Sequence, residues 1–371
     1  MKLRSLIAAI CLVSLTNIVG ATLPDSLLHR YAAEMLIIGF RGDSVETDPD
    51  IKRYLQEIRP GGIILFDIDL TSGGGLGTRN IKSRDQVSHL TSEMKKIAGY
   101  PLFIAVDQEG GLVQRLKPRY GYSPLPSAYH LGTEVNNVDS TDFYACLMAS
   151  QLKEAGVNMN LAPELDIHRD DCPVIGKLDR GYSSSPDSVA IHAGKTIERL
   201  AQQGIISVGK HFPGHGSAIS DSHYGLTDVT STWTEAELLP FKTLIDSGNL
   251  QAIMTAHIFN RNIDPDLPAT LSHKILTGLL RDKMGFDGVI ITDDMYMKGI
   301  IDNYSIEQAV IMAINAGADM MIMGNNINTG YEADRPDKII EIIVHAVKDG
   351  KIPEQRLIDA HNRISNLQNR L

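Results

Sequence analysis

The segment from Lys210 to His223 holds the densest set of chemically active side chains in this 371-residue sequence. It contains three histidines, a lysine and an aspartate among turn-forming residues, and it follows the apolar run 205–208. A strand that ends in a polar, turn-rich loop is typical of a functional site. Asp221 and His223 are separated by one position, so both side chains project to the same side of an extended loop. Such a pair orients the imidazole and keeps its change of charge near neutral pH.

Polar residues also follow other apolar runs of the sequence. Charged side chains at these positions would be costly inside a sheet unless they are paired or functional, which makes them candidates for a site. The candidates are Asp107, Gln108, Glu109, Glu164, Asp166, His257, Asp293, Asp294, Asn325 and Asn326.

The elements that must position these residues form a recurring alternation of short apolar runs and longer amphipathic segments. The predicted strands are 35–40, 62–66, 102–106, 157–161, 205–209, 252–256, 289–292 and 320–323. Eight such alternations without a wide linker predict one α/β domain, a (β/α)₈ TIM-type barrel over residues 22–371, with a doubly wound open sheet as the alternative. In a parallel barrel the strand ends open on one face, so the polar candidates should meet in one pocket.

Three segments qualify this prediction. Residues 36–38 could continue a helix that begins around Asp25 instead of forming the first strand. The glycine-rich stretch 73–77 lacks the spacing of a phosphate loop, and we interpret it as part of a surface insertion, 67–82. A final helix is expected from about Pro353, because proline is tolerated in the first turn.

The composition restricts the class of protein. A net charge of −10 without a cluster of Lys and Arg argues against nucleic acid as a partner. Residues 1–21 combine Lys2 and Arg4 with a short apolar stretch and small residues, which predicts a cleaved signal peptide and an exported, periplasmic or secreted protein without a membrane span. Cys146 and Cys172 remain after processing, and the sequence leaves open whether they are bonded.

Three functional classes fit the candidate residues. Metal-dependent hydrolysis could use His211, His215, His223 or His257 with an aspartate, although the common two-histidine spacings are missing. Glycoside hydrolysis could use Asp293 or Asp294 as nucleophile and a histidine held by an aspartate as proton donor. A non-catalytic binding module is the third class.

Four stretches together resemble the β-N-acetylglucosaminidase branch of family 3 glycoside hydrolases, over about residues 30 to 350. They are KHFPGHG at 210–216 with DSH at 221–223, DQEGGLVQR at 107–115, NLAPELD at 160–166, and ITDDM at 291–295.

The resemblance implies a retaining mechanism with Asp293 as nucleophile, His223 as acid/base and Asp221 as its partner. It implies substrate contacts by Asp107, Arg115, Arg180, Lys210 and His211, and no metal or cofactor. Asp294 is expected to be structural, because adjacent strand residues face opposite sides. Arg180 follows a stretch that is longer than the usual family spacing.

The expected substrate is a small carbohydrate, an N-acetylglucosaminide from peptidoglycan fragments or chito-oligosaccharides, and the expected protein is a monomer. Phosphorolysis is the alternative reaction, because a histidine in place of a carboxylic acid would let an anionic acceptor approach. The insertion 67–82 is longer than in minimal members of the branch and could reshape the pocket rim.

Overall fold

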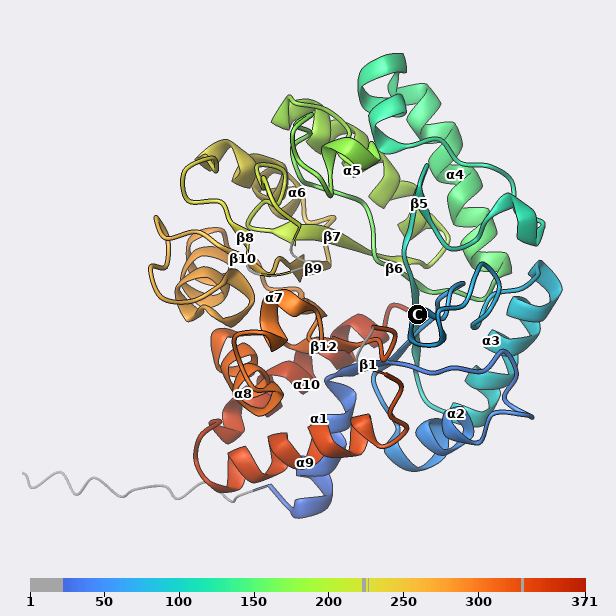
Figure 1. Cartoon of the computed structure of the whole chain (residues 1–371), viewed down its shortest axis with the longest axis vertical. Helices are drawn as coiled ribbons and strands as arrows, with labels where there is room; N and C mark the ends of the chain where they lie inside the picture. Colours follow the sequence, from blue (N-terminus) through green and yellow to red (C-terminus); the bar gives the residue numbers. More distant parts are fainter. Residues whose placement is uncertain (1–22, 222–224, 226, 328–329) are drawn as a thin grey trace, which may run out of the picture.

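A computed structural model describes residues 23–221, 225, 227–327 and 330–371, and its main sheet closes into a parallel barrel (Figure 1). The order around the barrel is β1-β12-β11-β9-β7-β6-β3-β2, and β2 pairs with β1 to complete it. The strands are β1 (Leu36–Gly39), β2 (Gly62–Ile64), β3 (Phe103–Val106), β6 (Met159–Asn160), β7 (Ile206–Phe212), β9 (Ala252–Thr255), β11 (Val289–Asp294) and β12 (Met320–Met323). The predicted (β/α)₈ barrel is confirmed, and the open sheet is excluded.

The first strand settles the ambiguity in the sequence. Helix α1 (Asp25–Glu34) ends before it, and Leu36 of β1 pairs in parallel register with Met321 of β12. Gly39 permits the close approach of these two strands, since a Cβ atom at this position would lie 1.9 Å from the carbonyl oxygen of Gly324.

Helices surround the strands in Figure 1 and bury the outer surface of the barrel. Their apolar side chains and those of the strands form one hydrophobic core. The helices are α2 (Pro49–Arg53), α3 (Arg84–Ala98), α4 (Val138–Glu154), α5 (Pro186–Gln202), α6 (Leu239–Asp246), η8 (Lys274–Lys283), α7 (Lys298–Ile301), α8 (Ile306–Ala316), α9 (Arg335–Lys348) and α10 (Glu354–Gln368). The predicted final helix is therefore confirmed as α10.

Two barrel strands extend further than the sequence predicts, and both extensions carry site candidates. Strand β7 includes Lys210 and His211, and β11 includes Asp293 and Asp294. These residues were predicted to follow their strands because charged side chains are rare in buried strands. Their ion pairs and hydrogen bonds, described below, compensate for the burial.

The insertion 67–82 is anchored to the barrel by Arg79, whose side chain is fully buried. Its guanidinium donates to the carbonyl oxygens of Phe40, Gly324 and Asn325, at the ends of β1 and β12. It also donates to Asn326 Oδ1 at 2.7 Å, and Asn326 in turn donates to the carbonyl oxygen of Ile68. The base of the insertion is therefore part of the pocket rim, whereas its glycine-rich tip, 73–75, lies toward solvent.

Two predictions fall on residues that the structure does not describe. The predicted signal peptide, 1–21, and His223 lie outside the described residues. Among the residues that the structure does describe, no helix is long and apolar enough to cross a membrane. Cys146 and Cys172 are both free thiols.

Candidate active site

A cavity of about 300 Å³ opens at the carboxyl ends of the barrel strands. Three predicted site residues from distant parts of the sequence line it together: Asp107, Arg115 and Asp293. The remaining wall is largely apolar and includes Leu161, Met254, Ile322 and the insertion residues Ile68 and Leu70. A concave apolar site with a few converging charged groups is the usual form of a small-molecule pocket.

A small hairpin brings Arg115 back to Asp107. The antiparallel strands β4 (Gln108–Gly110) and β5 (Val113–Gln114) form it directly after β3. The turn requires glycine at Gly110, which has a φ of 108° and lies where a Cβ atom would be 2.2 Å from the carbonyl oxygen of Pro126. As a result, Arg115 Nη2 donates to Asp107 Oδ2 at 3.1 Å.

Charges of alternating sign run inward from the cavity as an ion-pair row, which begins with the half-buried Arg115 and Asp107 and continues with buried side chains. Its members, in order of contact, are Arg115, Asp107, Lys210, Glu109, Arg180, Glu164, His211 and Asp166. The row contains four cationic side chains and four carboxylates, so charge is balanced within it when His211 is protonated. The predicted contact residues Lys210, Arg180 and His211 belong to this row and not to the cavity wall, and their side chains are 2%, 10% and 9% exposed. Of the three, Lys210 contacts the cavity residue Asp107 directly.

Lys210 is the second cation of the row and the most deeply buried. Its Nζ atom lies 3.1 Å from Asp107 Oδ1 and 2.7 Å from Glu109 Oε1. Burial alone would lower the pKa of Lys210, but the charges of Glu109 and Asp107 outweigh it and raise that pKa. The ammonium group therefore keeps its charge over the physiological pH range.

Arg180 continues the row through a two-pronged contact with Glu109. Its Nε and Nη2 atoms each donate at 2.8 Å, one to each carboxylate oxygen, and Nη2 also lies 2.9 Å from Glu164 Oε2. Such forked pairs fix orientation as well as charge. The longer connection that precedes Arg180 therefore still brings this side chain to the site.

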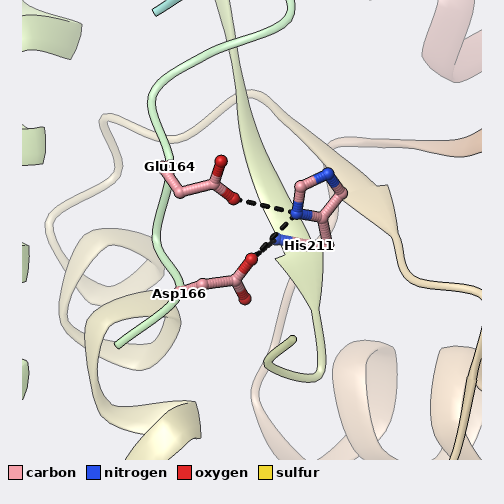
Figure 2. A group of neighbouring side chains, drawn as sticks. All are labelled: Glu164, Asp166 and His211. Carbon is pink, nitrogen blue, oxygen red and sulfur yellow. Dashed lines mark hydrogen bonds and ion pairs between the residues drawn. The ribbon is translucent and has the colours of Figure 1, made fainter. Parts of the chain in front are cut away.

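His211 is the last cation of the row and lies between two carboxylates, as Figure 2 shows. Its Nδ1 atom lies 2.8 Å from Glu164 Oε1 and 2.8 Å from Asp166 Oδ2. Burial would lower the pKa of His211, but Glu164 and Asp166 together raise it to about 10. The three ligand atoms lie within 4.8 Å of one another, close enough to share a cation. With His211 protonated, the imidazolium bridges the two carboxylates. The same three side chains are also the group of ligands that the metal alternative requires.

The paired aspartates at the end of β11 have different environments. Asp294 lines the cavity as Asp293 does, and its carboxylate accepts hydrogen bonds from the backbone N–H groups of Tyr296 and Gly324, at 3.0 and 3.2 Å. Burial raises the pKa of Asp294 to about 6, and the neighbouring charge of Asp293 adds to the shift. Asp293 accepts the backbone N–H of Asp294 at 2.8 Å, and its half-buried side chain is in the cavity wall.

His257 supports the end of β11 from the neighbouring strand. Its Nε2 atom lies 3.0 Å from the carbonyl oxygen of Asp294, and its Nδ1 atom lies 2.8 Å from Thr270 Oγ1. A carbonyl oxygen can only accept, so Nε2 carries the proton and donates. This placement gives His257 a structural contact that the sequence could not distinguish from metal ligation.

The loop that follows β7 contains the remaining predicted residues. His215 is buried, its backbone N–H donates to Asp166 Oδ1 at 2.6 Å, and burial together with the charge of His211 lowers the pKa of its side chain to about 3. Asp221 is half-buried and lies at the end of the described part of this loop. The place of His223 relative to Asp293 is therefore not described.

The carboxylates that bridge the cations were recognised in the sequence only as polar residues near strand ends. Glu109, Glu164 and Asp166 were predicted as site candidates without a role, and each contacts a predicted substrate-binding residue. The sequence offered one signal for their role: Glu109 lies two residues after Asp107, and Glu164 and Asp166 belong to the 160–166 motif. Partners from different strands cannot be paired from sequence alone, since pairing depends on the packing of the barrel.

Known proteins are similar to this chain in both sequence and fold. The curated beta-hexosaminidase of Tolumonas auensis is 38% identical over 285 residues, which cover 76% of this chain and 80% of that protein. The beta-hexosaminidase of Alkalilimnicola ehrlichii is 33% identical over 337 residues, 88% of each chain. A solved glycoside hydrolase family 3 beta-N-acetylglucosaminidase from Paenibacillus sp. superposes with a TM-score of 0.82 at 32% identity, over 92% of this chain and 62% of that longer one.

The resemblance stated from the four motifs is confirmed by these relatives and by a match to the family's sequence pattern. The pattern described as the glycosyl hydrolase family 3 N terminal domain matches residues 30–367, nearly the whole barrel. The chain belongs to glycoside hydrolase family 3.

Proposed function

We propose that this enzyme is a retaining exo-β-N-acetylglucosaminidase with Asp293 as its nucleophile. The observation that carries the proposal is the position of Asp293 at the end of β11, in the wall of a cavity that also contains Asp107 and Arg115. The relatives named beta-hexosaminidase support the substrate class. The cavity volume lies at the small end of the range for ligand pockets, which favours one terminal sugar over a long chain.

In the first step the Asp293 carboxylate attacks the anomeric carbon, and the bond to the leaving oxygen breaks. The His223 imidazolium donates its proton to that oxygen, so the aglycone departs as a neutral alcohol. In the second step neutral His223 takes a proton from water, which attacks the same carbon and releases Asp293. Two displacements at one carbon give overall retention. Asp221 keeps the imidazole oriented and stabilises its charged form.

The sugar is bound by the outer end of the ion-pair row in this proposal. Asp107 accepts from ring hydroxyls while Arg115 and Lys210 hold the carboxylate and donate to the sugar. Arg180 and His211 lie further along the row, outside the cavity wall, and act through these residues. Because these groups are already ordered by one another, little side-chain entropy is lost when substrate binds. The proposed substrates are peptidoglycan fragments or chito-oligosaccharides, met outside the cytoplasm after export by residues 1–21, and the proposed enzyme acts as a monomer.

The first experiment compares aryl β-N-acetylglucosaminide with aryl β-glucoside and β-xyloside. We expect the N-acetyl substrate to be hydrolysed by far the fastest, and Asp293→Ala to reduce that rate at least about 1000-fold. Asp287→Ala is a matched control, because this aspartate lies before the same strand but its side chain is 95% exposed. Near wild-type activity of Asp293→Ala, or a preference for the glucoside, would reject the proposal.

Phosphorolysis is the competing reaction and has a simple test. The products are analysed with and without inorganic phosphate. Hydrolysis predicts free N-acetylglucosamine in both reactions, with the β-anomer formed first. The appearance of N-acetylglucosamine 1-phosphate, with a rate that rises with phosphate concentration, would assign the chain to a phosphorylase instead.

The proton donor is tested by the leaving group. His223→Ala should slow substrates with a poor leaving group far more than activated aryl substrates, because an activated group departs without a proton. Equal losses on both substrates would show that His223 is not the donor.

A further inference from the structure

Glu109 joins two cations of the ion-pair row and has no direct place in the cavity wall. Its side chain is 3% exposed. One oxygen, Oε1, receives both Lys210 Nζ at 2.7 Å and Arg180 Nη2 at 2.8 Å, while Oε2 receives Arg180 Nε at 2.8 Å. This geometry fixes the distance between an ammonium and a guanidinium that would repel each other without the carboxylate.

Glu164 lies one step further along the row and contacts two cations at ion-pair distance, without the hydrogen-bond geometry that Glu109 has. Its side chain is 1% exposed, with Oε2 at 2.9 Å from Arg180 Nη2 and Oε1 at 2.8 Å from His211 Nδ1. Arg180 is therefore held on both sides, and each cation of the inner row contacts two carboxylates. At the outer end of the row, Asp107 and Arg115 are the members that also line the cavity.

The two glutamates are therefore placed to control where the sugar-binding end of the row lies. Removal of the charge from Glu109 would leave Lys210 with Asp107 alone and would bring the repulsion of Arg180 into effect. Lys210 would then approach Asp107 more closely or leave its position. Removal of the charge from Glu164 would act on Asp107 only through Arg180, Glu109 and Lys210, so its effect on the sugar should be smaller.

We propose that Glu109 and Glu164 are positioning residues, each of which holds two cations so that Asp107, Lys210 and Arg115 meet the sugar hydroxyls in one arrangement. This inference rests on the proposed glycosidase function. It assigns neither glutamate a step in the chemistry, since both act through the side chains that they hold.

The test measures how far each variant still recognises single hydroxyl groups. Aryl β-N-acetylglucosaminide is compared with its 3-, 4- and 6-deoxy analogues in the wild type and in Glu109→Gln, which keeps the shape of the side chain. We expect Glu109→Gln to lower kcat/KM on the parent substrate about 100-fold. For at least one hydroxyl group, its removal from the substrate should lower kcat/KM about 100-fold in the wild type and less than about 10-fold in Glu109→Gln, because the variant has already lost its contact with that hydroxyl.

Two further variants separate positioning from general destabilisation. Glu164→Gln should show the same pattern with a loss of about 10-fold, and Glu109→Asp, which keeps the charge but shortens the side chain, should fall between wild type and Glu109→Gln. Asp142→Asn is the control, since Asp142 makes the same forked contact with Arg199 on α4 and α5, away from the pocket. This control should leave all deoxy penalties at the wild-type size.

The outcomes are distinct. Deoxy penalties in Glu109→Gln and Glu109→Asp that equal those of the wild type would overturn the inference, even if both variants are less stable. If the wild type hydrolyses none of the N-acetylglucosaminides, the proposed function fails. The positioning role is then decided by the crystal structure of Glu109→Gln, where a shift of about 1 Å or more in Lys210 or Arg180 supports it and unmoved side chains overturn it.

Discussion

Buried charges lie at both ends of this barrel, and they are arranged differently. At the carboxyl ends of the strands, cations and carboxylates alternate in the ion-pair row, and one end of the row reaches a cavity. At the opposite end, at the start of β12, the fully buried Asp319 lies within ion-pair distance of three guanidiniums, those of Arg281, Arg356 and Arg363. We call this second group the Asp319 cluster.

The Asp319 cluster connects β11, β12 and α10. Asp319 Oδ2 accepts the backbone N–H of Ile290 at 3.0 Å, which links β12 to β11. Arg356 and Arg363 belong to α10, so their contacts hold the last helix against the barrel. In TIM-type barrels the carboxyl ends carry the active site and the opposite end serves stability. Loss of an ion pair should therefore affect mainly activity in the ion-pair row and mainly folding stability in the Asp319 cluster.

The largest expected effect on folding is at the Asp319 cluster. Asp319→Ala leaves three guanidiniums close together without their carboxylate, and we expect the free energy of unfolding to fall by about 3–5 kcal/mol. Urea denaturation measures this loss, and kcat/KM of the folded fraction should stay within about twofold of wild type. The control Asp142→Ala breaks a more exposed pair and should cost less than about 1 kcal/mol. Equal losses of unfolding free energy in the two variants would show that the Asp319 cluster contributes no more to stability than the exposed pair does.

Another buried carboxyl group, that of Glu237, has a pKa that is set mainly by burial. Its side chain packs against Gly214, where a Cβ atom would lie 2.4 Å from Glu237 Oε2. Burial raises the pKa of Glu237 to about 7. The folded state therefore binds the proton more tightly than the unfolded state, and this stabilising contribution is present below about pH 4.5 and is lost as the pH rises through 7.

Glu237→Gln keeps the neutral shape and removes the titration. We expect the loss of unfolding free energy between pH 4.5 and 7 to become smaller by about 3 kcal/mol in this variant. Denaturation at several pH values measures how steeply the unfolding free energy falls with pH, and this is the slope to compare. An unchanged slope would show that the carboxyl is ionised in the folded protein and belongs with the paired charges.

The row itself is tested at Lys210. Lys210→Met should lower kcat/KM about 100-fold, or about 2.7 kcal/mol, because it removes a cation next to Asp107. The loss of stability should be smaller than for Asp319→Ala, since Asp107 keeps Arg115 and Glu109 keeps Arg180. Near wild-type kcat/KM with a large loss of stability would give the row the same role as the Asp319 cluster.

The sequence predicted the barrel because its strands are buried on both faces and therefore appear as short apolar runs. It also predicted that Asp107 and Asp293 would share a pocket, since strand ends converge in this fold, whereas Arg115 was expected there only from the family resemblance. The lengths of β7 and β11 were predicted less well. Their last residues are charged, and only partners from other strands make a charged residue acceptable there.

The partners in the row and in the Asp319 cluster could not be predicted for the same reason. Asp319 and Glu109 are both acidic residues close to an apolar run, and nothing in their local sequence indicates which cations reach them. The roles of Asp166 and His257 depend likewise on side chains 45 and 13 residues away. Such contacts are set by the packing of the whole barrel.

The central claim is that Asp293 attacks the sugar, and covalent trapping tests it most directly. A fluorinated N-acetylglucosaminyl fluoride forms the glycosyl-enzyme but slows its hydrolysis, so the ester can be located by peptide mass spectrometry. We predict one sugar per chain, attached to the peptide that contains Asp293, and none in Asp293→Ala. A label on another carboxylate, or turnover to an inverted product without any label, would contradict this account.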